Sequence, residues 1–258
     1  MVVYRCEDSL EGVFTAIYNA YEDKRNHEDT LISLTDELFL FAEYLEVIVD
    51  GEKVQKVIRT LRRQFGEEDY EWLCYALASE DSYKAQAVYR TVVEGLRGKA
   101  ARGHLFDNLA CDAVQRAFTL GRGAYNEYHH LMGFVRFQEL EGGILYSKIG
   151  PKNNILTFLM PHFADRFATE NFMIYDDNRG LLGLHPAGRS WYLMQGVEDL
   201  ERAEQFRLSD KEEAYQELFC YFCRKIAIKE RSNPKLQKNM LPLRFQEYMV
   251  EFQRENEN

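Results

Sequence analysis

The chain has 258 residues and a formal net charge of −10 at pH 7. Its hydrophobic content of 46% and charged content of 29% are typical of a globular protein with one large core or two small ones. The acidic excess argues against nucleic acid wrapped over the whole surface, because every phosphate contact would form in a repulsive field. Local basic patches stay compatible with this charge.

No apolar run approaches the ~20 residues that a membrane helix needs, and the first residues lack the pattern of a signal peptide. The odd number of cysteines is scattered along the chain, which is typical of a reducing compartment. We therefore expect a cytoplasmic protein that does not contact a membrane. The cysteines are Cys6, Cys74, Cys111, Cys220 and Cys223.

The first half of the chain is predicted to be mainly helical. A short strand at Val2–Tyr4 precedes a helix that Asp8 or Ser9 can cap, and residues 22–43 look charged and irregular. Residues 44–49 alternate as a strand and end at an Asp-Gly turn. Apolar stripes at helical spacing then predict helices over 51–65, 67–79, 82–97 and 105–131.

The hydrophobic period changes at Gly133, where we expect the long helix to end. The pattern predicts an antiparallel sheet between about 132 and 194, with a helix laid on it, and then a C-terminal helix and a basic tail. The fold class is therefore α+β, either as one compact domain over 1–258 or as lobes 1–103 and 104–258. The predicted strands are 132–140, 144–149, 172–175, 181–184 and 189–193, and the helices are 154–167 and 210–228.

Residues Tyr125–Phe137 collect the side chains best suited to a site. Glu127 and His130 are three positions apart and share a helix face. His129 is the residue before His130 and lies one step around the helix from it. Arg136 follows in a predicted strand, either at a solvent-facing rim or directed at an anion. The competing interpretation is that a histidine near a helix end is a cap or a hydrogen-bonded neighbour.

Two later segments allow more than one interpretation. Cys220 and Cys223 lie inside a predicted helix without a second ligand pair, so we expect two apolar helix residues and no metal site. The tail from Arg231 to Phe245 is the most basic region, and its cations with interleaved aromatic rings could hold a phosphate backbone and stack a base. A solvated arm lying over the core is the alternative.

Four separated patches of the sequence resemble one bacterial family of DNA metabolism and DNA repair proteins. Its members are encoded beside a radical-SAM protein, and a related domain is fused to a uracil-DNA glycosylase domain. The patches begin at Tyr4, at Glu127, at Phe163 and at Asn233. The matching residues are Tyr4, Asp8, Ser9, Glu11, Gly12, Thr15, Ala16, Ile17 and Tyr18, then Glu127, His129, Gly133, Phe134, Arg136 and Phe137, then Phe163, Arg166 and Phe167, and finally Asn233, Pro234, Met240, Pro242 and Arg244.

The resemblance implies a DNA repair or DNA metabolism protein that acts on single-stranded or damaged DNA together with the radical-SAM partner, with no cofactor of its own. If the protein is a catalyst, His129, with Glu127 or Asp8 near it, would supply proton transfer. The phosphate ligands would be Arg136, Arg166, Arg231, Lys235 and Arg244. We expect His129, Arg136 and Arg166 to line one cleft, with Asp8 or Glu11 at its rim.

Two other functions stay open. The chain could be a non-catalytic adaptor that recruits or feeds the radical-SAM protein, or an enzyme acting on a small molecule or nucleotide. Plain capping and core packing would equally explain Asp8 and Glu11 at the start of the first helix.

Overall fold

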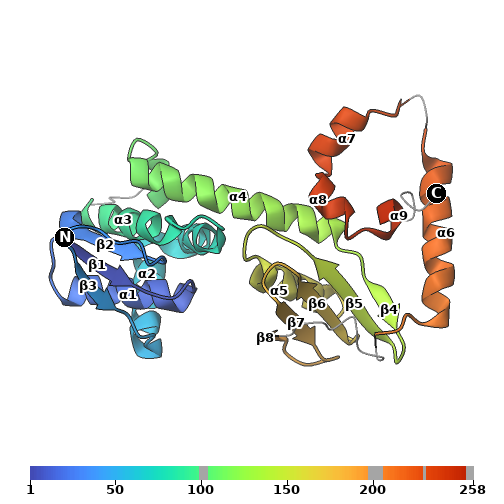
Figure 1. Ribbon diagram of the computed structural model, residues 1–258, viewed down its shortest axis with the longest axis horizontal. Helices are drawn as coiled ribbons and strands as arrows, with labels where there is room; N and C mark the ends of the chain where they lie inside the picture. The colour runs from blue at the N-terminus through green and yellow to red at the C-terminus, as the bar shows by residue number, and fades with distance from the viewer. Residues whose placement is uncertain (99–103, 197–205, 229–230, 254–258) are drawn as a thin grey trace. The chain divides into compact units, whose positions relative to one another are not determined.

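The computed structural model describes residues 1–98, 104–196, 206–228 and 231–253 (Figure 1). The chain divides into two compact units, Met1–Asn126 and Glu127–Asn258, and the division falls inside one helix, α4 (Asp112–Phe134). The units are described separately below. Whether the chain folds as a single domain stays a prediction.

Unit 1 contains a three-stranded parallel sheet that the sequence did not lead us to expect. Its strands are β1 (Val2–Arg5), β2 (Thr30–Ser33) and β3 (Glu43–Glu46), in the order β2-β1-β3. The β2 strand falls in the stretch predicted to be irregular, where four residues were too short to show a period. The central strand β1 is almost entirely buried, as parallel strands usually are.

Helices cover the parallel sheet. α1 (Leu10–Glu22) follows β1 after a tight turn, and the Ser9 hydroxyl accepts a hydrogen bond from the Gly12 amide. A Cβ at Gly12 would lie 2.6 Å from the Glu7 carbonyl oxygen, so only glycine allows this turn. A short 3₁₀ turn, η1 (His27–Asp29), leads into β2.

The helices predicted over 51–65, 67–79 and 82–97 are confirmed. α2 (Gly51–Ala78) is broken at Gly66, whose φ of 88° separates the two expected segments, and α3 (Lys84–Arg97) follows. Their apolar stripes pack into a core with α1 and the sheet. The prediction that the next helix starts at residue 105 is wrong. A second 3₁₀ turn, η2 (Leu105–Asp107), lies there, and α4 begins at Asp112.

The prediction that Gly133 ends the long helix is wrong, since α4 continues to Phe134. A helical glycine costs only about 1 kcal/mol relative to alanine, and packing readily offsets this. Phe134 stacks on His130 and contacts Phe245, with ring centroids 5.8 Å away in both cases, which holds the last turn. The following strand, β4 (Gln138–Leu140), is correspondingly shorter than expected.

Unit 2 is built on a five-stranded sheet in the order β4-β5-β6-β7-β8. The prediction of a purely antiparallel sheet is wrong for one pair, because β5 and β6 are parallel. The helix between them, α5 (Leu156–Arg166), returns the chain to the starting edge and so makes the next strand parallel. The other pairs are antiparallel, and the strands are β5 (Ile144–Ile149), β6 (Phe172–Asp176), β7 (Leu181–His185) and β8 (Tyr192–Gln195).

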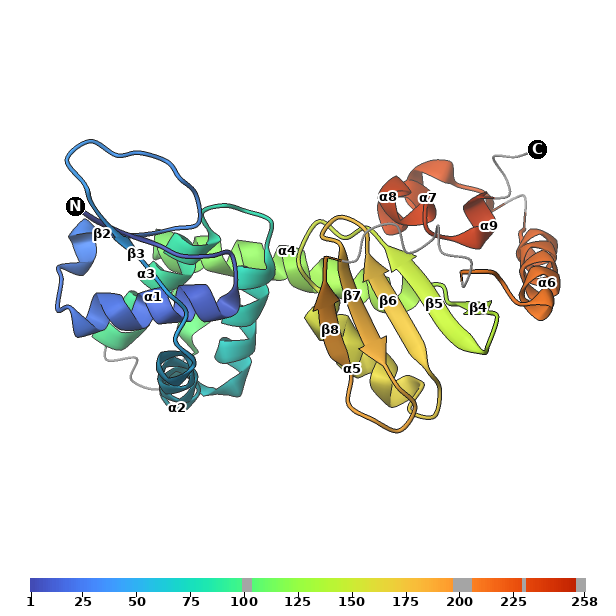
Figure 2. The same ribbon diagram turned by 60° about the horizontal axis from the view of Figure 1, so that its bottom comes forward.

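The α5 helix lies against one face of this sheet (Figure 2). Gly183 on β7 allows the approach, because a Cβ there would lie 2.4 Å from the sulfur of Met160. On the other face Tyr146 contacts Phe206, with ring centroids 5.0 Å apart. The sheet therefore has two apolar faces, as expected for a layered α+β fold.

The C-terminal part consists of helices α6 (Asp210–Ile226), α7 (Pro234–Met240), α8 (Leu243–Gln246) and α9 (Val250–Gln253). Within unit 2, α6 packs against α9. The α+β class is confirmed, with two sheets instead of one. None of the described helices combines the length and the apolar character needed to cross a membrane.

Candidate functional site

The buried carboxylate of Glu127 is the centre of the most highly connected polar site in unit 2. Its side chain is 1% exposed, and it accepts hydrogen bonds from the amides of Lys152 and Asn153 at 3.0 and 2.8 Å. The side-chain amide of Asn153 donates a further bond at 2.7 Å, and Arg244 Nη2 lies 3.2 Å from Oε1. Both carboxylate oxygens are thus used, and a buried charge is compensated by several donors.

The loop that bonds Glu127 is held in turn by the turn after β6. Arg179 donates to the carbonyl oxygens of Pro151 and Lys152 and lies 3.1 Å from Asp176 Oδ2. Asn178 also donates to the Pro151 oxygen, at 2.9 Å. Burial raises the pKa of the fully buried Asp176, and the Arg179 guanidinium opposes that rise.

These groups meet because β5 and β6 are parallel, so that both of their carboxyl ends lie at the same edge of the sheet. At this edge Lys148 Nζ lies 3.2 Å from Asp177, to which the Tyr248 hydroxyl donates at 3.4 Å. We call this set the strand-end cluster. Its members are Glu127, Lys148, Lys152, Asn153, Asp176, Asp177, Arg179, Arg244 and Tyr248.

The two predicted groups Glu127 and Arg244 are therefore brought together, but His129 lies elsewhere. Glu127 is buried whereas His129 is exposed on the same helix, as expected for residues two positions apart. His130 is the histidine that faces the C-terminal segment, with its ring 6.2 Å from that of Phe245. A role of His129 in proton transfer stays a prediction.

Arg136 is paired inside unit 2. Its Nε and Nη2 donate to Glu251 Oε1 at 3.1 and 2.9 Å, and the guanidinium lies 6.0 Å from the Phe219 ring. The second oxygen of Glu251 is buried without a hydrogen-bond partner among the described residues. Arg136 thus contacts α6 and α9, and its charge is already compensated by a carboxylate that is only 11% exposed.

The remaining predicted residues have different surroundings. Arg166 is exposed at the end of α5, 5.8 Å from the Phe167 ring, and Arg231 and Lys235 are exposed in the C-terminal segment. Asp8 belongs to unit 1, where it lies 2.6 Å from the buried Lys84 Nζ. The shared cleft of His129, Arg136 and Arg166 stays a prediction.

A comparison with known families identifies the chain. The model of the DUF4130 domain, described as a domain of unknown function, matches residues 82–251, which is more than half of the sequence. The chain belongs to the DUF4130 family. No curated protein matches it.

The DUF4130 match includes the whole strand-end cluster and the pair Arg136–Glu251, but not the parallel sheet of unit 1. Sequence analysis missed the cluster members Asn153, Asp176 and Arg179. The Asp-Asn-Arg-Gly sequence at 177–180 signalled only a turn. The predicted helix between two apolar strands was the available clue. A helical crossover makes the two strands parallel, and their carboxyl ends then lie at the same edge of the sheet.

The cysteines of α6 have ordinary packing roles in this DUF4130 protein. Cys220 is buried, and its thiol donates to the Val250 oxygen at 3.8 Å, while Cys223 is half-buried. Burial raises the pKa of Cys223. Within the ranges that the structure describes, no three potential ligands among His, Cys, Asp and Glu form a metal site. The absence of metal at these cysteines stays a prediction.

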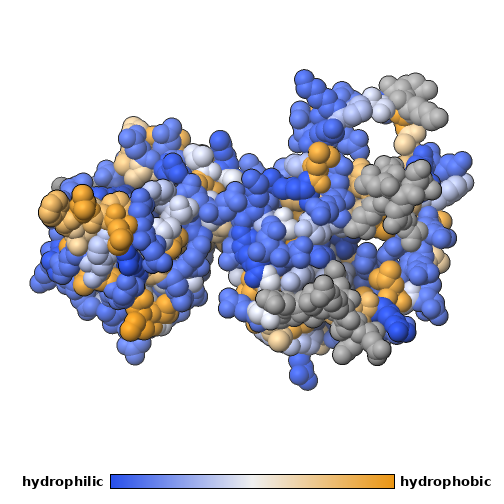
Figure 3. Space-filling view, viewed as in Figure 1, coloured by the Kyte–Doolittle hydropathy of each residue, from blue (hydrophilic) through white to orange (hydrophobic). Residues whose placement is uncertain are grey.

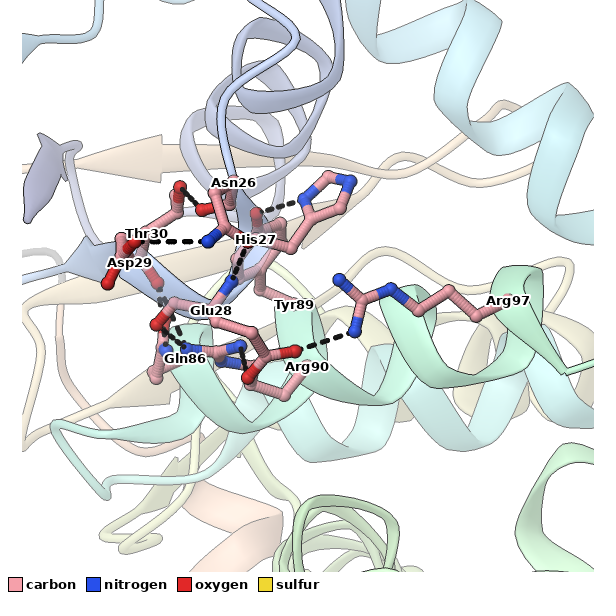
Figure 4. Close-up of polar contacts among 9 residues, drawn as sticks. All are labelled: Asn26, His27, Glu28, Asp29, Thr30, Gln86, Tyr89, Arg90 and Arg97. Carbon is pink, nitrogen blue, oxygen red and sulfur yellow. Dashed lines mark hydrogen bonds and ion pairs between the residues drawn. The ribbon is translucent and has the colours of Figure 1, made fainter.

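A second polar network lies in unit 1 and joins the η1 turn and β2 to α3 (Figure 4). His27 Nδ1 lies 2.6 Å from the hydroxyl of the fully buried Tyr89. Glu28 lies 3.2 Å from Arg90 and 2.6 Å from Arg97. Burial is the largest cause that lowers the pKa of His27, and the Arg97 and Arg90 charges lower it further. The network fixes an edge strand, which explains it without a ligand.

Proposed function

We propose that this DUF4130 protein works in DNA repair or DNA metabolism, binds single-stranded or damaged DNA, and acts with a radical-SAM protein. The resemblance of four sequence patches motivates the proposal. One observation about the chain itself supports it most: residues 224–244 contain seven basic residues and one acidic residue in a protein of net charge −10. Such a local excess is what phosphate binding requires in an acidic protein.

The exposure of these cations favours binding over intramolecular pairing. Arg224, Lys225, Arg231, Lys235 and Lys238 are all exposed, and none forms an ion pair with another residue that the structure describes. Aromatic rings lie beside them, since Lys225 Nζ is 5.3 Å from the ring of Tyr221, which is 59% exposed. Cations with exposed rings are the usual means of holding a single strand and stacking its bases.

The strand-end cluster supports a positioning role within this function. Glu127 binds Arg244 of α8, and Arg136 binds Glu251 of α9, so two ion pairs attach the C-terminal segment to the rest of unit 2. Since both partners in each pair are already engaged, the arrangement favours a binding component over a catalyst. It therefore favours the hypothesis that the chain is a non-catalytic adaptor for the radical-SAM protein.

An apolar stripe on α6 supports the partner half of the proposal. Tyr215, Leu218, Phe222 and Ile226 recur at helical spacing and are 54–65% exposed. On the face drawn in Figure 3, separate hydrophobic patches lie within a mainly hydrophilic surface. An exposed apolar stripe beside a basic surface suits a protein that contacts DNA and a second protein with one helix.

The DNA half is tested by fluorescence anisotropy with a labelled single strand. Replacing Arg231, Lys235 and Lys238 together by alanine should weaken binding and lower the slope of log affinity against log salt by about 2, at about 0.7 for each lost phosphate contact. Lys211→Ala is the matched control, because Lys211 is exposed on α6 outside the basic segment. Arg166→Ala tests one predicted phosphate ligand outside the basic segment.

Equal affinity and equal salt slope for the triple variant and the wild type would refute the DNA-binding surface. Arg136→Ala should weaken binding only as far as it loosens the C-terminal segment, because its guanidinium is paired with Glu251.

The partner half is tested by a pull-down with the radical-SAM protein, with and without DNA. Leu218→Asp and Phe222→Asp should abolish capture, while Glu217→Gln, on the same helix but outside the stripe, should not. Capture that survives both aspartate substitutions would exclude α6 as the contact. If the triple variant loses DNA but keeps the partner, the two surfaces are separate.

A further inference from the structure

A mainly apolar cavity, partly open to solvent, lies among the three helices α1, α2 and α3 of unit 1. It has a volume of about 130 Å³, and its buried wall residues are Ile17, Val57, Leu61 and Val92. An apolar cavity of roughly 150 Å³ can bind one benzene molecule. The cavity in unit 1 therefore has room for a ring, or for a branched alkyl group of similar size.

Two tyrosines form the α1 side of the cavity. Tyr18 and Tyr21 are three positions apart on α1, and residues at this spacing share a helix face. The Tyr21 ring lies 4.4 Å from the ring of His27, measured between centroids, and His27 is bonded to Tyr89 in the network of Figure 4. The same network therefore helps to hold this wall in place in the absence of a ligand.

The charge of the cavity wall is positive. Lys56 lines the cavity, and none of the described residues that line it is an aspartate or a glutamate. Burial raises the pKa of Tyr21 to about 12, so its hydroxyl stays neutral at pH 7 and adds no negative charge. A wall with one ammonium group and no carboxylate favours an anionic ligand over an amine.

Two lysines lie over the Tyr18 ring, but only one is available to a ligand. The ammonium groups of Lys53 and Lys56 lie 5.1 and 5.4 Å from the ring centre. Lys53 Nζ is engaged, since it lies 2.9 Å from Glu22 Oε2 and donates to Asn19 Oδ1 at 2.7 Å. Lys56 is exposed and forms no ion pair with another residue that the structure describes. Its flexible four-carbon stem lets the ammonium group follow an anion at the cavity.

The size and the charge of the cavity together restrict the ligand. The apolar walls favour an apolar body, because burying it removes hydrocarbon surface from water. A nucleobase fits less well, since its polar edge would lie against aliphatic side chains. The single ammonium group of Lys56 balances one negative charge, which matches a carboxylate better than a phosphate dianion.

We infer that this cavity binds a small monocarboxylate whose apolar body is about the size of one ring, with the body among α1, α2 and α3 and the carboxylate beside Lys56. The inference is independent of the proposed DNA function. Of the three helices, only α3 falls within the residues that the DUF4130 model matches.

The test uses the full chain with ¹³C-labelled methyl groups and follows the methyl signals of Val57, Leu61 and Val92. Phenylacetate, 2-phenylethanol and 2-phenylethylamine are probes that share a ring and differ in charge, and acetate lacks the ring. Phenylacetate should shift these signals and show nuclear Overhauser effects to the same methyl groups. It should bind at least about tenfold more tightly than acetate, because of the buried ring. It should also bind about threefold more tightly than 2-phenylethanol, because of an ion pair at an exposed lysine, and the amine should bind more weakly than the alcohol.

Lys56→Met tests the charge, because methionine keeps an apolar stem and loses the ammonium group. It should remove the preference of about threefold for phenylacetate over 2-phenylethanol. Arg63→Met is the matched control and should keep that preference, because Arg63 is exposed on the same helix and does not line the cavity. Thr60→Phe tests the cavity itself, since Thr60 is a half-buried wall residue and a ring there should weaken phenylacetate by at least about tenfold.

The inference is overturned if phenylacetate leaves the three methyl signals unshifted, or if the alcohol or the amine binds as tightly as phenylacetate. It is also overturned if Lys56→Met keeps the preference, if Arg63→Met loses it equally, or if folded Thr60→Phe binds like the wild type. If Thr60→Phe does not fold, the exposed Lys56 variant and its control decide the question.

Discussion

The two units of the molecule each place charged groups at the carboxyl ends of parallel strands, but they satisfy them differently. In unit 2 the chain itself completes the site, since Glu127 receives Arg244 and three donors from Lys152 and Asn153. In unit 1 the Nε and Nη2 of Arg5 are buried and have no acceptor among the described residues.

This difference separates buried charges that the chain compensates from buried donors that it leaves without an acceptor among the described residues. A buried charge whose partners are all internal contributes to stability and leaves little for binding. A buried donor without a partner costs free energy instead. Substitutions at the two edges should therefore differ in how much stability they cost.

The largest effect is expected at Glu127. Glu127→Ala leaves Arg244 and three other donors without their acceptor, so the free energy of unfolding should fall by about 3–5 kcal/mol. Urea unfolding followed by far-UV circular dichroism measures this loss. The control is Asn126→Ala on the exposed face of α4, expected within about 0.5 kcal/mol of the wild type. Similar losses for both variants would mean that the cluster does not hold unit 2 together.

A smaller loss is expected from the second ion pair of unit 2. Arg136→Met leaves the Glu251 carboxylate buried beside an apolar side chain, at a cost of about 2–4 kcal/mol. Glu251→Gln in the same protein should restore part of this loss, because it removes the uncompensated charge. A double-mutant cycle in which the two changes are simply additive would show that the pair contributes nothing.

These two pairs also show what the sequence could predict. The helices of unit 1 followed from apolar stripes, and β5 followed from alternation, because these signals are local. The parallel pairings depend on residues far apart in the chain, such as Val3 with Leu31, and a four-residue strand has too few positions to show a period. The sequence indicated Glu127 and Arg244 as site residues, but not that they bind each other.

The surroundings of Arg5 also could not be predicted from the sequence. Its sequence position, after a short β-like start, gives no reason to single it out among the 32 lysines and arginines of the chain. Its importance comes from the strands on both sides and from the ring of Tyr44, which only the folded sheet brings together. Orphaned donors are a property of packing, and local patterns do not encode them.

A pH effect is expected in the scaffold of the unit 1 cavity. Because the pKa of His27 is lowered on folding, the unfolded state binds its proton more readily, and stability is lost as the pH falls below the ordinary value of about 6.5. His27→Gln should cost about 1 kcal/mol at pH 7.5 through the lost Tyr89 hydrogen bond. It should also flatten the decline between pH 7.5 and 5.5.

Urea midpoints at the two pH values measure this, and Tyr89→Phe is the matched control. That variant loses the same hydrogen bond but keeps the histidine, so its decline with pH should persist. An equally steep decline in His27→Gln and the wild type would assign the pH dependence to other groups.

The smallest effect on stability is expected at Arg5, and it contrasts most directly with Glu127. Arg5→Met removes an ion pair with the exposed carboxylate of Glu46 and a contact with the Tyr44 ring. Each of these contributes at most about 1 kcal/mol. It also removes two buried donors without acceptors, which offsets much of that loss. The free energy of unfolding should therefore change by less than about 1 kcal/mol. A loss as large as that of Glu127→Ala would instead mean that Arg5, too, is held by the chain itself, and the contrast between the two strand ends would fail.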